Sequence, residues 1–220
     1  MTFVPLGDQA LLVYAAGEEA AVRFAEAVRA ANPDWLEDVV PAYASVGVFF
    51  DANRIHTAEA IAWLKALRVS TSKKTTVQKS HVIPVCYEMG PDLRRVAEFA
   101  GLKPETIVHR HVAASYTVYA IGFVPGFPYL GYLPESLSGV PRLDSPRLRV
   151  EPGSVGLTGR QTGIYPLPRP GGWNLIGRTP LAIVDVADGF FPLRVGDAVA
   201  FTRIDAAEFR RLDGQRLASA

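Results

Sequence analysis

Four arginines, Arg142, Arg147, Arg160 and Arg178, lie in a segment of the chain that is rich in glycine and proline. Arg147 and Arg178 each have a proline or a glycine beside them that holds the local backbone. A guanidinium held in one place presents a planar fork of donors to a carboxylate or a phosphate. The alternative is that these arginines brace the loops by bonding backbone carbonyls or nearby carboxylates. The sequence leaves both roles open for each arginine and favours ligand contact for at least one.

Other side chains of the same segment can line a binding site. Gln161 adds an amide with both donors and an acceptor. Pro170-Gly-Gly-Trp173 allows close backbone approach, and its tryptophan either stacks on a ligand or anchors a core. We therefore expect a pocket for a small anion, built by loops on a rigid scaffold. Its candidate substrate-binding residues are Phe123, Pro125, Gly126, Arg142, Arg147, Gln161, Tyr165, Trp173 and Arg178.

No self-sufficient catalytic motif is present in the sequence. Ser154 lies in Gly153-Ser-Val-Gly156, which lacks the spacing of a nucleophile elbow, so the catalytic residues stay unknown. Cys86, within an apolar run, is typical of a small buried hydrophobe. His109 and His111 are two residues apart, so on a helix they point in different directions and cannot hold one metal ion. We expect no metal site.

Four phrases of the sequence carry a resemblance to a known family. They are GF-x-PGFPYLG at 122–131, PRL-x-(S)PR at 141–147, GSVG-x-x-G-x-QTG-x-YP at 153–166 and PGGW-x-x-IGRTPL at 170–181. In this order they resemble the family known as the B subunit of 5-oxoprolinase, allophanate hydrolase subunit 1 or the Kip inhibitor of a sporulation histidine kinase. Related sequence occurs in the carboxyltransferase region of urea carboxylase.

The resemblance implies a cyclophilin-like barrel and a subunit that is inactive alone. In the 5-oxoprolinase reading, the complex opens 5-oxoproline to glutamate with ATP and magnesium, and the partners are a homologue of the C-type subunit and an A-type subunit of the LamB/YcsF kind. It also implies a site role for His111, whose alternative role is to cap the preceding helix. Two other readings stay open: inhibition of a sensor histidine kinase by protein binding, and a component of allophanate hydrolase or urea carboxyltransferase.

Composition excludes several classes of partner. The 220 residues carry 23 Lys+Arg and 22 Asp+Glu, so charge gives no reason to expect nucleic acid or an anionic membrane. No apolar run approaches the ~20 residues of a membrane span, and the first residues do not resemble a signal peptide. The single cysteine excludes an intrachain disulfide and fits a reducing cytoplasm.

The first third of the chain predicts an α+β domain. Its expected elements are a strand at 9–14, a helix at 18–31, strands at 39–43 and 46–50, and a helix from Thr57. With a strand at His81–Val85 to follow, this is the order of a ferredoxin-like unit. The polar stretch Ser70–Lys79 is the predicted linker.

The rest of the chain predicts many short strands with irregular connections, which indicates a closed or partly closed β-barrel. Helices are expected after Pro91, after Pro104 and after Asp205, and extended runs at 116–121, 174–178, 181–186 and 198–204. The predicted domains are therefore a ferredoxin-like domain at 1–71, a linker at 72–80, the barrel at 81–204, and a C-terminal helix and tail at 205–220.

Overall fold

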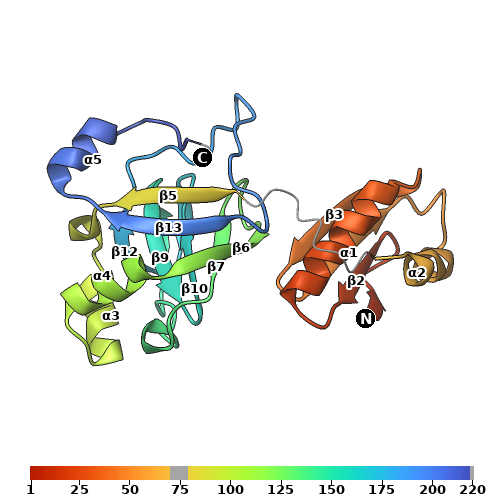
Figure 1. Ribbon diagram of the computed structural model, residues 1–220, viewed down its shortest axis with the longest axis horizontal. Coiled ribbons are helices and arrows are strands. Elements are labelled where there is room, and N and C mark those ends of the chain that lie inside the picture. Colours follow the sequence, from red (N-terminus) through yellow and green to blue (C-terminus); the bar gives the residue numbers. More distant parts are fainter. Residues whose placement is uncertain (70–78, 219–220) are drawn as a thin grey trace. The chain divides into compact units, whose positions relative to one another are not determined.

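The computed structural model describes residues 1–69 and 79–218, which form two compact units, Met1–Thr76 and Val77–Ala220 (Figure 1). All but the last two residues of the predicted linker, 72–80, lie outside the described residues, as do residues 219–220 of the predicted tail. The proposed linker boundaries therefore stay a prediction. Among the described residues, no sheet contains strands from both units.

The N-terminal unit is a four-stranded antiparallel sheet in the order β1-β2-β4-β3. Its elements are β1 Thr2–Pro5, β2 Ala10–Tyr14, α1 Glu18–Ala31, β3 Leu36–Ala42, β4 Ser45–Phe50 and α2 Thr57–Ala66. The predicted helix at 18–31 is confirmed by α1. One face of this helix is buried at helical spacing, and its residues are Ala21, Phe24, Ala25 and Val28. Asn32 ends it in the left-handed conformation.

The ferredoxin-like interpretation of this unit is not confirmed. The strand at His81–Val85 pairs in parallel with Ala198–Arg203 of the second unit and not with the first sheet. The edge position beside β2 is taken by β1, a strand at Thr2–Pro5 that the sequence did not indicate. Its mostly exposed residues give little periodic signal.

The second unit is built on a seven-stranded sheet in the order β12-β9-β10-β7-β6-β13-β5, with a two-stranded β11-β8 ribbon. The strands are β5 Ser80–Val85, β6 Ser115–Ile121, β7 Pro128–Gly131, β8 Arg147–Val150, β9 Ser154–Thr158, β10 Gln161–Ile164, β11 Arg169–Gly171, β12 Asn174–Arg178 and β13 Ala198–Arg203. The helices are α3 Leu93–Ala100, α4 Pro104–Ala113 and α5 Ala206–Leu212, with 3₁₀ turns at Tyr87–Met89 and Glu135–Leu137.

The sheet curls until its two edge strands meet. Cys86, directly after β5, and Arg178, the last residue of β12, exchange backbone hydrogen bonds of 2.8 and 3.0 Å. Glycine is required at this seam, because a Cβ on Gly177 would lie 2.6 Å from a Val85 methyl and one on Gly90 would lie 2.1 Å from the Ile176 carbonyl carbon. The result is the nearly closed barrel that the sequence predicted.

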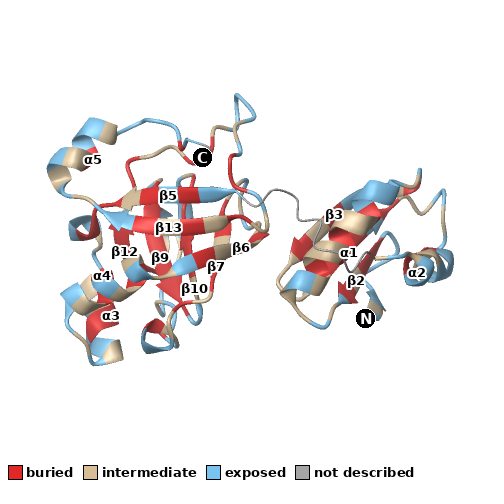
Figure 2. Ribbon diagram, in the orientation of Figure 1, coloured by how far each residue is buried: buried red, intermediate tan, exposed pale blue. Residues whose placement is uncertain are grey.

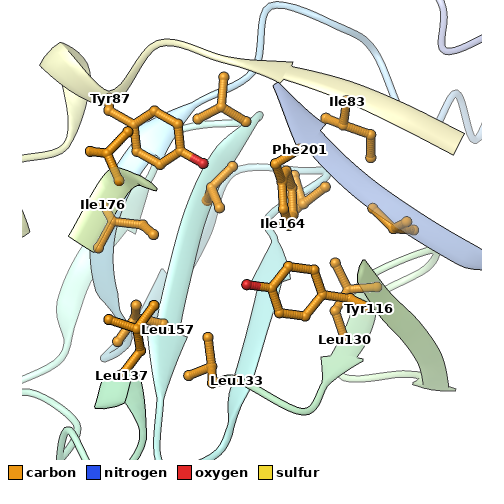
Figure 3. Close-up of a cluster of buried hydrophobic side chains, with 14 of the residues drawn as sticks. Ile83, Tyr87, Tyr116, Leu130, Leu133, Leu137, Leu157, Ile164, Ile176 and Phe201 are labelled. Carbon is orange, nitrogen blue, oxygen red and sulfur yellow. The ribbon is translucent and has the colours of Figure 1, made fainter. Parts of the chain in front are cut away.

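The barrel interior holds the larger core. Figure 2 shows buried residues along the barrel strands, and Figure 3 shows side chains from β5, β6, β7, β9, β10, β12 and β13 converging there. The hydroxyls of Tyr87 and Tyr116 point into this cluster (Figure 3). Strand alternation sends Val155 and Leu157 of β9 inward and leaves Gly156 between them facing Trp173.

The predicted helices of this unit are confirmed, and one predicted strand is wrong. Asp205 caps α5 by accepting from the backbone nitrogens of Ala207 and Glu208 at 2.9 and 2.8 Å. Residues 181–186 form no strand and make only isolated bridges, Ala182 with Arg216 and Asp185 with Phe190. Over residues 1–69 and 79–218, no helix combines the length and the apolar character that a membrane crossing needs.

Candidate functional site

A cavity of about 270 Å³ lies in the second unit where β12 ends. Two of the four sequence phrases supply much of its wall. The phrase at 153–166 contributes Gly153, which follows Pro152, and the phrase at 170–181 contributes Arg178, Thr179 and Pro180. The segment after β12 and the end of α5 complete it, and the further lining residues are Pro166, Leu181, Ala182, Ile183, Val184, Asp213 and Gly214. Of the predicted binding residues, Arg178 lies in this wall.

Arg178 is held in place at one end of its guanidinium. Its Nε donates to the Pro152 carbonyl at 2.9 Å, and the guanidinium carbon lies 5.8 Å from the ring centre of Phe209. In the parts of the chain that the structure describes, its two Nη nitrogens have no hydrogen-bond acceptor. The fork is therefore fixed by the backbone and keeps free donors, which is the arrangement that recognises a carboxylate.

The wall around Arg178 depends on tight backbone contacts. Gly153 has a positive φ of 81°, and a Cβ there would lie 2.2 Å from the Thr179 carbonyl oxygen. Gly126, another predicted residue, lies against Val184 of the cavity wall, where a Cβ would lie 2.1 Å from a Val184 methyl. Gly126 thus supports the cavity from outside.

The predicted aromatic residues gather on the outer face of the barrel. Gly156 and Gly163 leave room there, since a Cβ on either would lie 3.0–3.1 Å from Trp173. Phe127 packs edge-to-face against Tyr165 and Trp173 at centroid distances of 5.1 and 5.4 Å. Trp173 is 5% exposed and Tyr165 1% exposed, so both anchor a small core and neither offers a face to a ligand.

Phe123 and Pro125 are the exposed part of this region. Phe123 is 60% exposed at a positive φ of 68°, and its ring lies 5.7 Å from that of Phe127. Arg142 is also exposed, and its charge opposes the rise that burial causes in the pKa values of the Tyr129 and Tyr165 hydroxyls. Phe123, Pro125 and Arg142 are accessible, so their predicted binding role stays a prediction.

Arg147 has a bracing role. Its Nη2 donates to both carboxylate oxygens of Asp92, at 2.7 and 2.8 Å. Asp92 is 8% exposed and also accepts from the backbone nitrogen of Leu175 at 2.7 Å. The arginine thereby joins β8, the start of α3 and β12. Arg160, the fourth arginine of the pattern, lies over the Tyr132 ring at 4.3 Å.

Gln161 and Arg178 do not line one concave surface, contrary to the expectation. Gln161 pairs with Thr158 at one end of β9, and Arg178 pairs with Ser154 at the other end. At about 3.3 Å per strand residue, these ends are roughly 13 Å apart. The sequence phrase containing Gln161 belongs to the barrel wall, but the amide itself lies away from the cavity.

His111 is fully buried in the barrel, away from any open surface. Its Nδ1 lies 2.7 Å from the Tyr87 hydroxyl and its Nε2 lies 3.1 Å from Thr162 Oγ1, while its ring stacks on Phe201 at 4.6 Å. Burial lowers the pKa of His111 to about 3, so the imidazole is neutral. The capping alternative is not observed, because both ring nitrogens bond to side chains. The site role of His111 stays a prediction.

Sequence reasoning missed the residues that organise these groups. Asp92 lies in no phrase of the family resemblance and meets Arg147 only through the fold. Asp213, beside the cavity, also lies outside the phrases. A second buried pair, His81 with Asp197 at 3.2 Å, lies where β5 meets the turn before β13. The one available signal was Thr162 within the QTG phrase, whose hydroxyl bonds the Gly156 carbonyl at 3.0 Å.

Comparisons with known proteins agree with this architecture. A family model described as carboxyltransferase domain, subdomain C and D, matches residues 1–189. A protein of Bacillus subtilis (strain 168) is named as the B subunit of 5-oxoprolinase, and it is 37% identical to this chain over an alignment 228 residues long. The alignment covers 93% of this chain and 93% of that protein.

Solved structures show the same fold within longer chains. The structure of TTHA0988 matches with a TM-score of 0.79 and 36% identity over 90% of this chain, but only 40% of that chain. The urea amidolyase of K. lactis matches with a TM-score of 0.79 over 100% of this chain and 16% of that one. Its 18% identity makes this a likeness of fold alone.

Proposed function

The chain belongs to the family of carboxyltransferase domains, subdomain C and D, and we propose that it is the B-type subunit of an ATP-dependent 5-oxoprolinase. The observation that carries the proposal is the 37% identity to a protein named as the B subunit of 5-oxoprolinase, which extends over 93% of both chains. The reaction adds one water across the lactam bond of 5-oxoproline to give glutamate, and a second water is consumed as ATP becomes ADP and phosphate.

The proposed enzyme is a complex of this chain with partner subunits. In the proposal, a homologue of the C-type subunit binds this chain directly, an A-type subunit of the LamB/YcsF kind completes the enzyme, and the complex works in the cytoplasm. Over residues 1–69 and 79–218, no three His, Cys, Asp or Glu side chains are grouped to hold a metal ion. The proposal assigns ATP and magnesium to the complex as a whole and assigns neither to a residue of this chain.

This chain's own contribution is to bind and orient the carboxylate of 5-oxoproline. Arg178 does so with its free Nη donors, while the Pro152 carbonyl fixes its Nε. Pro152, Pro166 and Pro180 of the cavity wall limit backbone motion around it. The lactam carbonyl is thereby held at a defined distance for groups of the partner subunits. We also propose the cyclophilin-like description for the barrel.

The two other readings have less support. The Bacillus subtilis relative carries the 5-oxoprolinase name and not that of a kinase inhibitor. The likeness to urea amidolyase rests on fold at 18% identity. Both readings become outcomes of the reconstitution experiment.

Reconstitution tests the proposed function. The purified chain alone is expected to release no ADP from ATP in the presence of 5-oxoproline, and turnover is expected when the C- and A-type partners are added. Robust turnover by the isolated chain would refute the subunit proposal. No turnover with every partner present would move the interpretation to kinase inhibition.

Arg178→Lys tests the role of the cavity. Lysine keeps the charge but removes the fork, and losing a bond to a charged group costs about 1.5–3 kcal/mol, or roughly 10- to 150-fold in affinity. We expect 5-oxoproline to bind more weakly while the thermal midpoint changes little. A lower midpoint with unchanged binding would instead show that Arg178 only braces Pro152.

A further inference from the structure

The Arg178 cavity contains a second charge that the proposed carboxylate contact does not use. Asp213, directly after α5, lines the same cavity as Arg178. The two side chains form no ion pair with each other, and within the described residues Asp213 has no other ion-pair partner. One unpaired cation and one unpaired anion therefore face a single small space.

Two residues of the cavity wall have backbone nitrogens that find no acceptor among the described residues. Ile183 and Val184 line the cavity and are only 2% and 8% exposed. No acceptor among residues 1–69 and 79–218 receives a hydrogen bond from either backbone nitrogen. Because buried N–H groups are almost always paired, these two donors are available to water or to a ligand.

A ligand that satisfies both charges carries a carboxylate and a cationic nitrogen close together. An α-amino acid has this arrangement, because its ammonium and carboxylate are attached to the same carbon. A cavity of about 270 Å³ has room for a ligand of this size. Dicarboxylates without an amine would leave Asp213 facing a second negative charge or an apolar carbon.

We infer that the cavity is an α-amino acid site in which Arg178 binds the carboxylate and Asp213 selects for the ammonium. The inference rests on the proposed carboxylate role of Arg178. For a 5-oxoprolinase it has a direct consequence: the ring nitrogen of 5-oxoproline is a neutral lactam N–H, whereas the same nitrogen in glutamate is an ammonium. Asp213 then favours the product, glutamate, over the substrate.

Titration calorimetry on the full purified chain tests this selectivity with three probes. L-Glutamate has the amine, glutarate lacks it, and 5-oxoproline carries a neutral N–H. We expect glutamate to bind roughly three- to tenfold more tightly than glutarate, because Asp213 is solvent-exposed and its ion pair is partly screened. Equal binding of glutamate and glutarate, or binding of neither, would overturn the inference.

Asp213→Asn identifies the residue responsible. The variant is expected to weaken the binding of glutamate until its affinity equals that of glutarate. The affinity for glutarate is expected to stay unchanged. Asp144→Asn is the matched control, because it removes the same charge from an exposed aspartate outside the cavity, and it is expected to leave the ratio unchanged. An equal loss for both ligands in Asp213→Asn would show a general effect on the cavity and would contradict amine selection.

The reconstituted complex separates this inference from the proposed function. If the complex does not hydrolyse 5-oxoproline but the chain distinguishes glutamate from glutarate through Asp213, the amino acid site stands and the 5-oxoprolinase proposal fails. If the complex is active and the chain shows no preference for the amine, the site inference fails alone.

Discussion

Arg147 and Arg178 stand in similar sequence surroundings, the first after a proline and the second after a glycine. The fold gives them different partners. Arg147 Nη2 contacts both oxygens of the buried Asp92, whereas Arg178 is fixed by a backbone carbonyl through Nε and keeps its Nη donors free within the described residues. The difference teaches that a rigid backbone around an arginine does not assign its role. The position of the nearest buried carboxylate does.

The largest effect is expected when Arg147, the bracing arginine, loses its carboxylate partner. Asp92→Asn removes the charge that pairs with Arg147 and disturbs the acceptor for the Leu175 backbone nitrogen. A part-buried arginine without its carboxylate is costly, so we expect a loss of about 2–4 kcal/mol in the free energy of unfolding. Urea denaturation followed by circular dichroism measures it.

The control for this variant is Asp144→Asn, which changes an exposed aspartate in the same loop region as Arg147. A surface change of this kind is expected to stay within about 0.5 kcal/mol. If Asp92→Asn also cost less than about 1 kcal/mol, Arg147 would not be a structural brace, and its predicted ligand role would be open again.

The sequence predicted the helices better than the site, for physical reasons. The helix at 18–31 has an apolar face at helical spacing, and Asp205 is followed three residues later by Glu208. Strands β9 and β10 lie in the glycine-proline phrases. They are buried on both faces and carry glycines at packing contacts, so their sequences show no alternation.

The roles of the candidate residues depend on contacts that are distant in sequence. Asp92 precedes Arg147 by 55 residues, and Thr162 follows His111 by 51. Residue type alone could not show that Trp173 packs on Gly163, or that Gln161 lies at the opposite end of β9 from Arg178. The sequence phrases indicated the region of the candidate site. The role of each residue in that region depends on contacts that only the fold creates.

A second prediction extends the comparison to the fully buried His111. The unfolded histidine binds a proton near pH 6.5, while burial lowers the pKa of the folded one to about 3. Between these values the unfolded chain holds more protons, so the stability that this group contributes is complete above pH 6.5 and decreases as the pH falls toward 3. We expect a loss of about 1 kcal/mol per pH unit.

Denaturation at about pH 6.5 and about pH 5, both above the folded pKa, measures this slope in the wild type and in two variants. His111→Gln is expected to be less stable at neutral pH but to show a flatter slope. His109→Gln, an exposed histidine of the same helix, is the matched control and is expected to keep the wild-type slope. Equal slopes in all three proteins would contradict the buried, neutral state of His111.

The smallest effect is expected at Arg178, the arginine with free Nη donors, when a neighbouring negative charge is removed. Glu151 is exposed and accepts from Arg149 Nε at 2.7 Å, and this hydrogen bond, with the charge of Arg178 contributing, holds the pKa of the Glu151 carboxyl below its usual value. Because Arg178 favours the charged form of Glu151, Glu151 must weaken the attraction of Arg178 for an anion by the same interaction.

Glu151→Gln should therefore strengthen binding of 5-oxoproline by about twofold at low salt without a measurable change in thermal midpoint, because exposed ion pairs contribute little to stability. The gain should disappear in high salt, where charges at the surface are screened. Glu105→Gln removes an exposed glutamate that pairs with Arg203 at 2.7 Å and lies outside the cavity wall, so it is expected to change nothing. A gain in Glu105→Gln as well would assign the effect to net charge. Unchanged affinity in Glu151→Gln would mean that 5-oxoproline binds beyond the field of Arg178, and the two arginines would then differ only in how they brace the barrel.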